Sequence, residues 1–138
     1  MPQAQYPNSG ALELAEAIQG LMADSVIHLY KAPLSLAPIL TLADCEAQEA
    51  DYDGYAPKTV TAFNTPYLDP AGGATTASGY DQFNYGPAAS PPVTNNIYGL
   101  FVTTSEGDLL IVFAFDNPAP MAQVGDSVPV NVLLNFGK

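Results

Sequence analysis

The sequence predicts a mainly β fold, namely an antiparallel β-sandwich or jelly roll with a short N-terminal helix. Three apolar runs rich in Val, Ile, Phe and Tyr lie in residues 96–136, separated by turn signals at residues 105–108 and 124–127. The chain shows no alternation of strands with helices, which would predict a parallel sheet. Short strands joined by turns favour a sandwich or jelly roll over a closed barrel.

The middle and last of these runs differ in the spacing of their apolar residues. Residues 128–136 alternate between apolar and other residues, which is typical of a half-buried strand. Residues 109–115 are apolar on both faces, although an antiparallel strand is usually polar on one side. We therefore expect the second face of this strand to be covered by another protein chain or by a helix predicted at residues 10–22.

The N-terminal part of the chain predicts an arm followed by one domain. A length of 138 residues is typical of a single domain. We expect an extended arm at residues 1–9 and one β-sandwich domain at residues 10–138. Apolar residues recur at helical spacing within residues 10–22, and Ser9 is the expected N-cap of this helix.

The pattern between this helix and the last three strands is more broken. We expect a first strand at residues 26–31, a polar connection with room for a helical turn at residues 40–49, and a bent or interrupted strand at residues 52–63. Residues 64–92 hold five prolines and four glycines, so they predict a long loop. A short strand at residues 80–85 fits within that loop.

The charge of the chain excludes several classes of partner. Three basic and fourteen acidic residues give a net charge of −11, and arginine is absent. Such a chain repels nucleic acid and anionic membrane surfaces, and it lacks the guanidinium fork that binds phosphate. No apolar run approaches the ~20 residues of a membrane span, and residues 1–21 do not resemble a signal peptide. We expect no nucleic-acid or membrane partner, and a chain that is made in the cytoplasm and stays there or leaves the cell by a route other than the usual export signal.

The residues that most often carry catalysis lack a supporting motif. His28 is the only histidine and Cys45 the only cysteine, so neither a disulfide nor a typical zinc site can form within one chain. No serine lies in a nucleophile motif. We expect His28 to be a hydrogen-bonded structural or interface residue, and the chain to be neither an enzyme nor a cofactor-binding protein.

Residues 44–53 are acidic and invite a test for calcium. The spacing at residues 49–54, E-x-D-x-D-G, is that of the start of a calcium loop. Val60, however, stands where the bidentate glutamate of such a loop belongs. A solvated acidic rim is the preferred interpretation, and a calcium site of different geometry at Asp51 and Asp53 is the alternative.

Several short motifs give the chain a resemblance to a known set of proteins. They are HLY at residues 28–30, LAD at 42–44, GYA at 54–56, YGLFVT at 98–103, GDLL at 107–110, Phe115, and GD at 125–126. In these motifs the chain resembles small β-sandwich virion proteins of tailed bacteriophages. That set includes head decoration (cement) proteins, often trimers at three-fold positions of the capsid, and also tail or fibre components.

The resemblance implies a structural protein that acts as a homotrimer bound to the major capsid protein on the outer surface of a phage head. The apolar residues expected to make subunit contacts are Ile97, Leu100, Val102, Leu110 and Val112. The residues expected to contact the capsid are Pro2, Tyr6 and Pro7 in the arm, and Tyr67, Tyr80, Phe83 and Tyr85 in the long loop. An alternative is a tail or fibre module that binds surface glycans, with Tyr80, Phe83 and Tyr85 beside Asp81 and Asn84 in an exposed groove.

Overall fold

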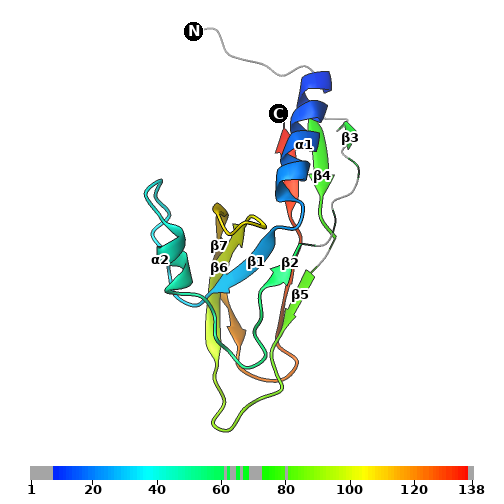
Figure 1. Ribbon diagram of the computed structural model, residues 1–138. Coiled ribbons are helices and arrows are strands. Elements are labelled where there is room, and N and C mark those ends of the chain that lie inside the picture. Colours follow the sequence, from blue (N-terminus) through cyan, green and yellow to red (C-terminus); the bar gives the residue numbers. More distant parts are fainter. Residues whose placement is uncertain are drawn as a thin grey trace.

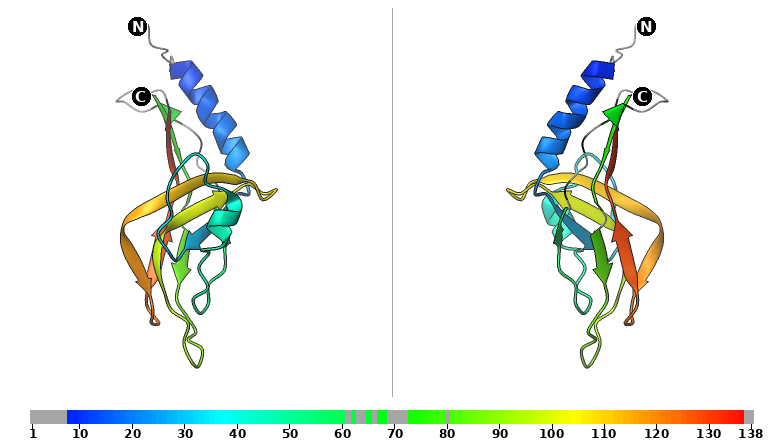
Figure 2. Two further views of the ribbon diagram at one scale, coloured as in Figure 1. Left: turned by 90° about the vertical axis from the view of Figure 1, so that its left-hand side faces the viewer. Right: turned by 90° about the vertical axis from the view of Figure 1, so that its right-hand side faces the viewer.

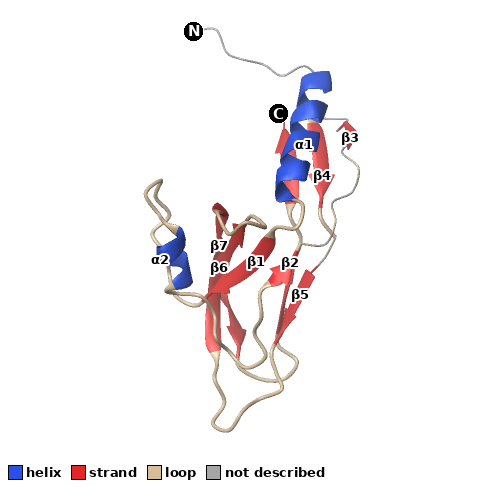
Figure 3. Ribbon diagram, in the orientation of Figure 1, coloured by secondary structure: helices blue, strands red, loops and turns tan. Residues whose placement is uncertain are grey.

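The structure is a computed structural model, described for residues 8–60, 62, 65, 67–68, 73–79 and 81–136. These residues form antiparallel β-sheets with helix α1 (Asn8–Met22) at the N-terminus and a five-residue helix α2 (Leu42–Glu46) (Figures 1 and 3). The prediction of a mainly β chain with a short N-terminal helix is confirmed. Because α1 begins at Asn8, Ser9 lies inside the helix, and its predicted place as the N-cap is wrong.

Four strands form the larger sheet, in the order β2-β1-β6-β7. They are β1 (Val26–Tyr30), β2 (Lys58–Thr59), β6 (Asn95–Thr103) and β7 (Leu109–Met121). The strands β6 and β7 are the hairpin predicted from the first two apolar runs, and its turn is closed by the Gly107 amide, which donates to the Thr104 carbonyl. Of the strand predicted at residues 52–63, the described residues show the two residues of β2, and residues 52–57 form a turn and loop; residues 61 and 63 lie outside the described part.

Five shorter strands make up the remaining sheets: β3 (Tyr67–Leu68), β4 (Ala74–Ala77), β5 (Asp81–Asn84), β8 (Ser127–Val130) and β9 (Leu133–Phe136). The strand β4 pairs with β9, and β5 pairs with β8, with a register shift of one residue between the two ladders. Ser78 bridges this shift, because its amide donates to the Val132 carbonyl at 2.8 Å and its Oγ accepts from the Val132 amide at 2.8 Å. Residues predicted as one long loop thus carry three short strands, of which only β5 was expected.

The main core lies between the larger sheet and the β5–β8 pair. Its largest buried side chains come from β1, β5 and β6, and include Leu29, Phe83 and Ile97. Helix α1 packs along β4 and β9 (Figure 1) and adds Met22 to this core. A second cluster on the opposite face of the larger sheet is formed by Tyr30, Cys45 and Phe101.

The second apolar face of β7 is covered differently from our expectation. Val112 packs against the cluster of Tyr30 and Phe101, where Leu34, Leu40 and Leu42 also lie. Among the described residues this cover comes from residues 34–42 of the same chain, and not from another chain or from α1, the two covers that were expected. The opposite face of β7 packs on the main core through Leu110, Ile111 and Phe115, and it leaves a groove that is described below.

Candidate docking surface along strand β7

Polar side chains gather at one place in the larger sheet, around His28. The His28 ring has Nδ1 2.8 Å from Oε2 of Glu49 and Nε2 3.1 Å from Oγ1 of Thr103. It stacks on Phe101 with ring centroids 4.5 Å apart. The Tyr55 hydroxyl donates to the same Glu49 oxygen at 2.7 Å. Burial, and then this hydrogen bond, raise the pKa of Tyr55, so it remains a neutral donor.

This order of carboxylate, imidazole and hydroxyl is that of a catalytic triad, and it needs a chemical test. The nucleophile of a triad must reach a substrate, whereas Thr103 is buried. Its hydroxyl lies 3.1 Å from the half-buried ring of His28. The hydrogen bonds instead fasten residues 49–55 to β1 and β6. A hydrogen-bonded structural His28 was the sequence-based prediction, and the geometry agrees with it.

The carboxylates of Asp51 and Asp53 serve separate parts of the fold. Asp51 accepts hydrogen bonds from Lys31 Nζ at 2.9 Å and from Asn95 Nδ2 at 3.0 Å, which lower its pKa. Among the described residues, no group of three or more His, Cys, Asp or Glu side chains gathers to hold a metal ion. The calcium alternative at Asp51 and Asp53 finds no support in this geometry.

Asp53 organises the loop that precedes β6. Its Oδ2 accepts from the amides of Ala89 and Val93 at 2.7 and 3.0 Å, and from the Tyr85 hydroxyl at 3.1 Å. The two amide hydrogen bonds are the main cause of the lowered pKa of Asp53. Its own backbone joins in, because the Gly86 amide donates to the Asp53 carbonyl at 2.8 Å. This aspartate is therefore a loop anchor.

The edge of the larger sheet that is formed by β7 is apolar and open in the described chain. Within the part of the chain that the structure describes, no strand pairs with the outer edge of β7. Figure 2 shows β7 arching away from β8 and β9, which are drawn in orange and red. Between them lies a groove of about 330 Å³. Its lining residues are Leu100, Val102, Ile111, Phe113, Phe115 and residues 129–133.

Large apolar side chains are exposed on both sides of this edge. Phe113 and Leu133 are 59% and 58% exposed beside the groove. On the other face of β7, a second hollow of about 300 Å³ lies between residues 109–112 and residues 36–40. Leu36 and Ile39 in that segment are 52% and 85% exposed. We refer to the outer edge of β7 with Leu36, Ile39, Phe113 and Leu133 as the β7 surface.

A buried tyrosine fixes the position of β7 against the sheet. The Tyr30 hydroxyl crosses over β6 and donates to the carbonyl oxygen of Phe113 at 2.8 Å. It passes over Gly99, where a Cβ atom would overlap both the Phe113 carbonyl oxygen and the Tyr30 hydroxyl. Gly99 is therefore needed for its lack of a side chain, and the middle of β7 is held firmly although its outer edge is free.

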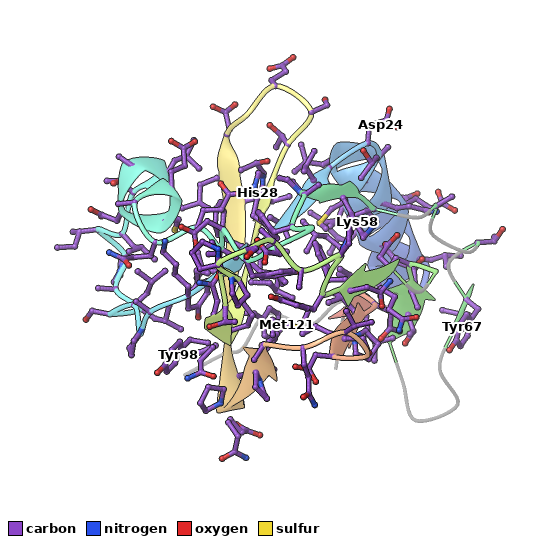
Figure 4. All side chains as sticks on the ribbon, turned by 90° about the horizontal axis from the view of Figure 1, so that it is seen from below. Asp24, His28, Lys58, Tyr67, Tyr98 and Met121 are labelled. Atoms are coloured by element: carbon purple, nitrogen blue, oxygen red, sulfur yellow. The ribbon has the colours of Figure 1, made fainter. Side chains whose placement is uncertain are left out.

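The residues predicted to make subunit contacts fall into three groups. Leu100 and Val102 form the buried floor of the groove, Leu110 and Val112 are half-buried on β7, and Ile97 lies in the core. Tyr67 is exposed on β3, at the periphery of the molecule (Figure 4). Pro2, Tyr6, Pro7 and Tyr80 lie outside the described residues.

The positions of Phe83 and Tyr85 contradict the prediction that the long loop exposes them for contact. Both were expected to be exposed, and both are buried. Alternation along β5 turns Phe83 inward against the main core, and Tyr85 follows on the same side with its hydroxyl on Asp53. An exposed aromatic groove built on these two residues is not present in this chain.

Leu36 and Ile39, two residues of the β7 surface, were not among the predicted contact residues. Prolines at positions 33 and 38 marked residues 33–38 as a break. The apolar residues between and after these prolines were the available signal, since a solvated connection rarely needs them.

Comparisons with family models, with curated proteins and with solved structures find no match for this chain. The described helices were also tested for membrane spans. None of them combines the length and the apolar character that crossing a bilayer requires.

Proposed function

We propose that this chain is a non-enzymatic structural protein of a virus particle, a decoration protein bound to the outer surface of a phage head. The observation that carries the proposal is the β7 surface, which exposes large apolar side chains on an otherwise strongly acidic chain. Contiguous exposed apolar surface of this kind marks sites of protein–protein interaction. The proposed partners are the major capsid protein and further copies of this chain in a homotrimer.

The charge of the chain suits this location. A protein with a net charge of −11 and no arginine is repelled by packaged DNA and is compatible with the outside of a shell. Decoration stabilises a shell by linkage, because a protein that binds only the assembled shell lowers the free energy of that state. A closed trimer multiplies weak contacts, so that each subunit needs only a modest docking surface.

The arrangement of the sheets supports the proposed β-sandwich or jelly roll. The larger sheet and the β5–β8 pair contribute side chains to the same core, as the two layers of a sandwich do. Asn8 and Ser9 belong to α1, so the predicted boundary between arm and domain at residues 9 and 10 is wrong, and the proposed single domain begins with α1. Leu110 and Val112 are half-buried against side chains of their own chain, so under this proposal the subunit contact shifts to the exposed Phe113 beside them.

The proposal is tested on isolated phage heads. Heads that carry this protein should release their DNA at a higher temperature than heads that lack it, and adding back the purified protein should restore that temperature. Equal release temperatures would overturn the decoration role. Counting copies in an intact particle separates the alternatives, since hundreds of copies indicate the shell and a handful indicate a tail or fibre component.

The oligomeric state needs its own measurement. The native mass in solution should be three times that of one chain at micromolar concentration. A mass equal to one chain would contradict the trimer, although single copies could still bind the shell.

A further inference from the structure

The two halves of β7 differ in their protection against pairing with other strands. Exposed sheet edges are usually blunted by charges and prolines. Residues 116–120 carry such protection in Asp116, Pro118 and Pro120, all of them exposed. Residues 109–115, LLIVFAF, carry none, although their outer edge is equally unpaired in the described chain. A strand that pairs with a partner along one half of its length needs an unprotected edge in that half only.

The backbone of the unprotected half points hydrogen-bonding groups outward. The Phe113 carbonyl oxygen faces the sheet, because it lies over Gly99 and accepts from the Tyr30 hydroxyl. In a trans peptide the carbonyl and the following amide point in opposite directions. The Ala114 amide therefore points to the open edge, where it can donate to an added strand.

The side chains around this edge suit a strand that is apolar on both faces. A strand paired with residues 109–115 would lie between the two hollows beside β7. Its alternate side chains would enter the groove near Phe113 and Leu133 on one face, and would meet Leu36 and Leu40, which line the second hollow, on the other. Strand addition gains affinity from main-chain hydrogen bonds and specificity from such alternate pockets.

The charges at the ends of the unprotected half identify the kind of strand that fits. Glu106 and Asp108 precede it and Asp116 follows it. Basic residues at both ends of an added strand would face these carboxylates. A second copy of β7 would bring the same acidic ends, and antiparallel pairing centred on Val112 would place Asp108 opposite Asp116 twice.

We infer that residues 109–115 of β7 accept, by strand addition, an extended apolar segment of another protein that carries Lys or Arg at both ends. The inference deepens the proposed function, on which it rests for the identity of the partner, the major capsid protein. In this pairing, a strand of the partner accepts a hydrogen bond from the Ala114 amide.

A pair of synthetic peptides tests the charge requirement. The probe is capped Lys-Val-Ala-Val-Ala-Val-Lys, which is apolar on both faces between its charged ends, and its matched control carries Glu in place of both Lys residues. The Lys peptide should bind about tenfold more tightly at low ionic strength, and the difference should shrink at high ionic strength. Amide NMR signals of residues 109–115 should shift on binding. Equal binding of the two peptides, no binding, or shifts confined to other strands would overturn the inference.

A proline tests the backbone pairing. Ala114→Pro removes the outward amide at an exposed position, and an edge strand tolerates proline. Ala114→Ser keeps the amide and serves as the control. The proline variant should keep the thermal midpoint of the wild type within a few degrees and lose peptide binding at least about tenfold, whereas the serine variant should bind normally. Unchanged binding by a folded proline variant would overturn the inference.

An assay on isolated phage heads tests strand addition and the decoration role separately. If wild-type protein and Ala114→Pro protect heads equally, the decoration role stands and strand addition falls. If neither protects heads but the Lys peptide still binds the β7 edge, the strand-addition site stands and the capsid partner falls. A dimer in solution that Ala114→Pro separates would show that a second copy is the occupant, against the inference.

Discussion

The two sides of the larger sheet use their side chains in opposite ways. Around β1, polar groups bind one another: Glu49 joins His28 and Tyr55, and Asp53 gathers the amides of the loop before β6. Along the outer edge of β7, apolar side chains are exposed and the backbone edge is unpaired in the described chain. The polar residues here therefore stabilise the chain itself, whereas the apolar edge is left uncovered by the described part of the chain.

The largest expected effect comes from Gly99, which links the two sides. In Gly99→Ala, the added Cβ meets the Phe113 carbonyl oxygen and the Tyr30 hydroxyl, and a backbone atom cannot easily move away. We expect the free energy of unfolding to fall by about 3 kcal/mol, as for severe overpacking. The measurement is urea denaturation followed by circular dichroism.

Gly20→Ala is the matched control for this change. Gly20 lies in α1 with no atom close to the added Cβ, so the alanine should raise stability by up to about 1 kcal/mol. Equal stability of the two variants would show that Tyr30 and β7 are not packed as described.

The next effect concerns the polar side of the sheet. Glu49→Ala leaves the Tyr55 hydroxyl and the His28 ring without their shared acceptor. We expect a loss of about 2 kcal/mol, typical of hydrogen bonds to a partly buried charged group. Glu46→Ala, in the exposed part of α2, should change stability by less than about 0.5 kcal/mol. A similar loss of stability in both variants would show that the hydrogen bonds of Glu49 are not what stabilises this side of the sheet.

A smaller effect depends on pH. The pKa of Asp53 is lowered in the folded protein, chiefly by the amides of Ala89 and Val93. A lowered pKa means that the ionised Asp53 stabilises the fold above the ordinary carboxyl range, and that this contribution disappears as pH falls through the folded-state pKa. The difference in urea midpoint between wild type and Asp53→Asn should therefore be present at pH 6, shrink as the pH falls below 3.8, and vanish only below the lower pKa of the folded state.

Glu106→Gln, in the exposed turn between β6 and β7, is the control for that titration. Its midpoint should follow that of the wild type at every pH. A constant difference between wild type and Asp53→Asn across the range would contradict the role of the Asp53 charge.

The smallest effect on stability is expected at the open side. Phe113→Ser removes an exposed side chain, so the free energy of unfolding should change by less than about 0.5 kcal/mol. Binding to heads should nevertheless be lost. Val124→Ser is the control, because Val124 is also exposed but lies in the turn between β7 and β8. A large loss of stability in Phe113→Ser would place Phe113 in the core and not on a docking surface.

The sequence predicted the hairpin of β6 and β7 well because its signal is local. Apolar β-branched and aromatic residues flank a turn that contains a glycine, and nearby residues decide the pairing. The same reasoning failed at Phe83 and Tyr85, where prolines and glycines on either side suggested a loop. Their burial depends on β8, more than forty residues further along the chain, and local patterns do not contain such distant pairing.

The open side of the sheet was predicted in part. The apolar residues on both faces of 109–115 predicted a cover for the second face, and residues 34–42 supply one. Which segment covers which face follows from the path of residues 34–42, and that path depends on how α2 seats Cys45 beside Tyr30 and Phe101. The asymmetry between Asp116 and the unprotected residues before it is visible in the sequence, but it gains meaning only once β7 is known to be an edge strand.

The seating of Cys45 has a practical consequence for labelling. This thiol lies on the buried face of α2, and burial raises its pKa, so it is a poor target for thiol reagents in the folded protein. A cysteine introduced at the exposed Ile39 would then be the one thiol that reacts quickly. A fluorophore attached there would stand beside the open edge of β7 and report, by its change in emission, the arrival of a partner.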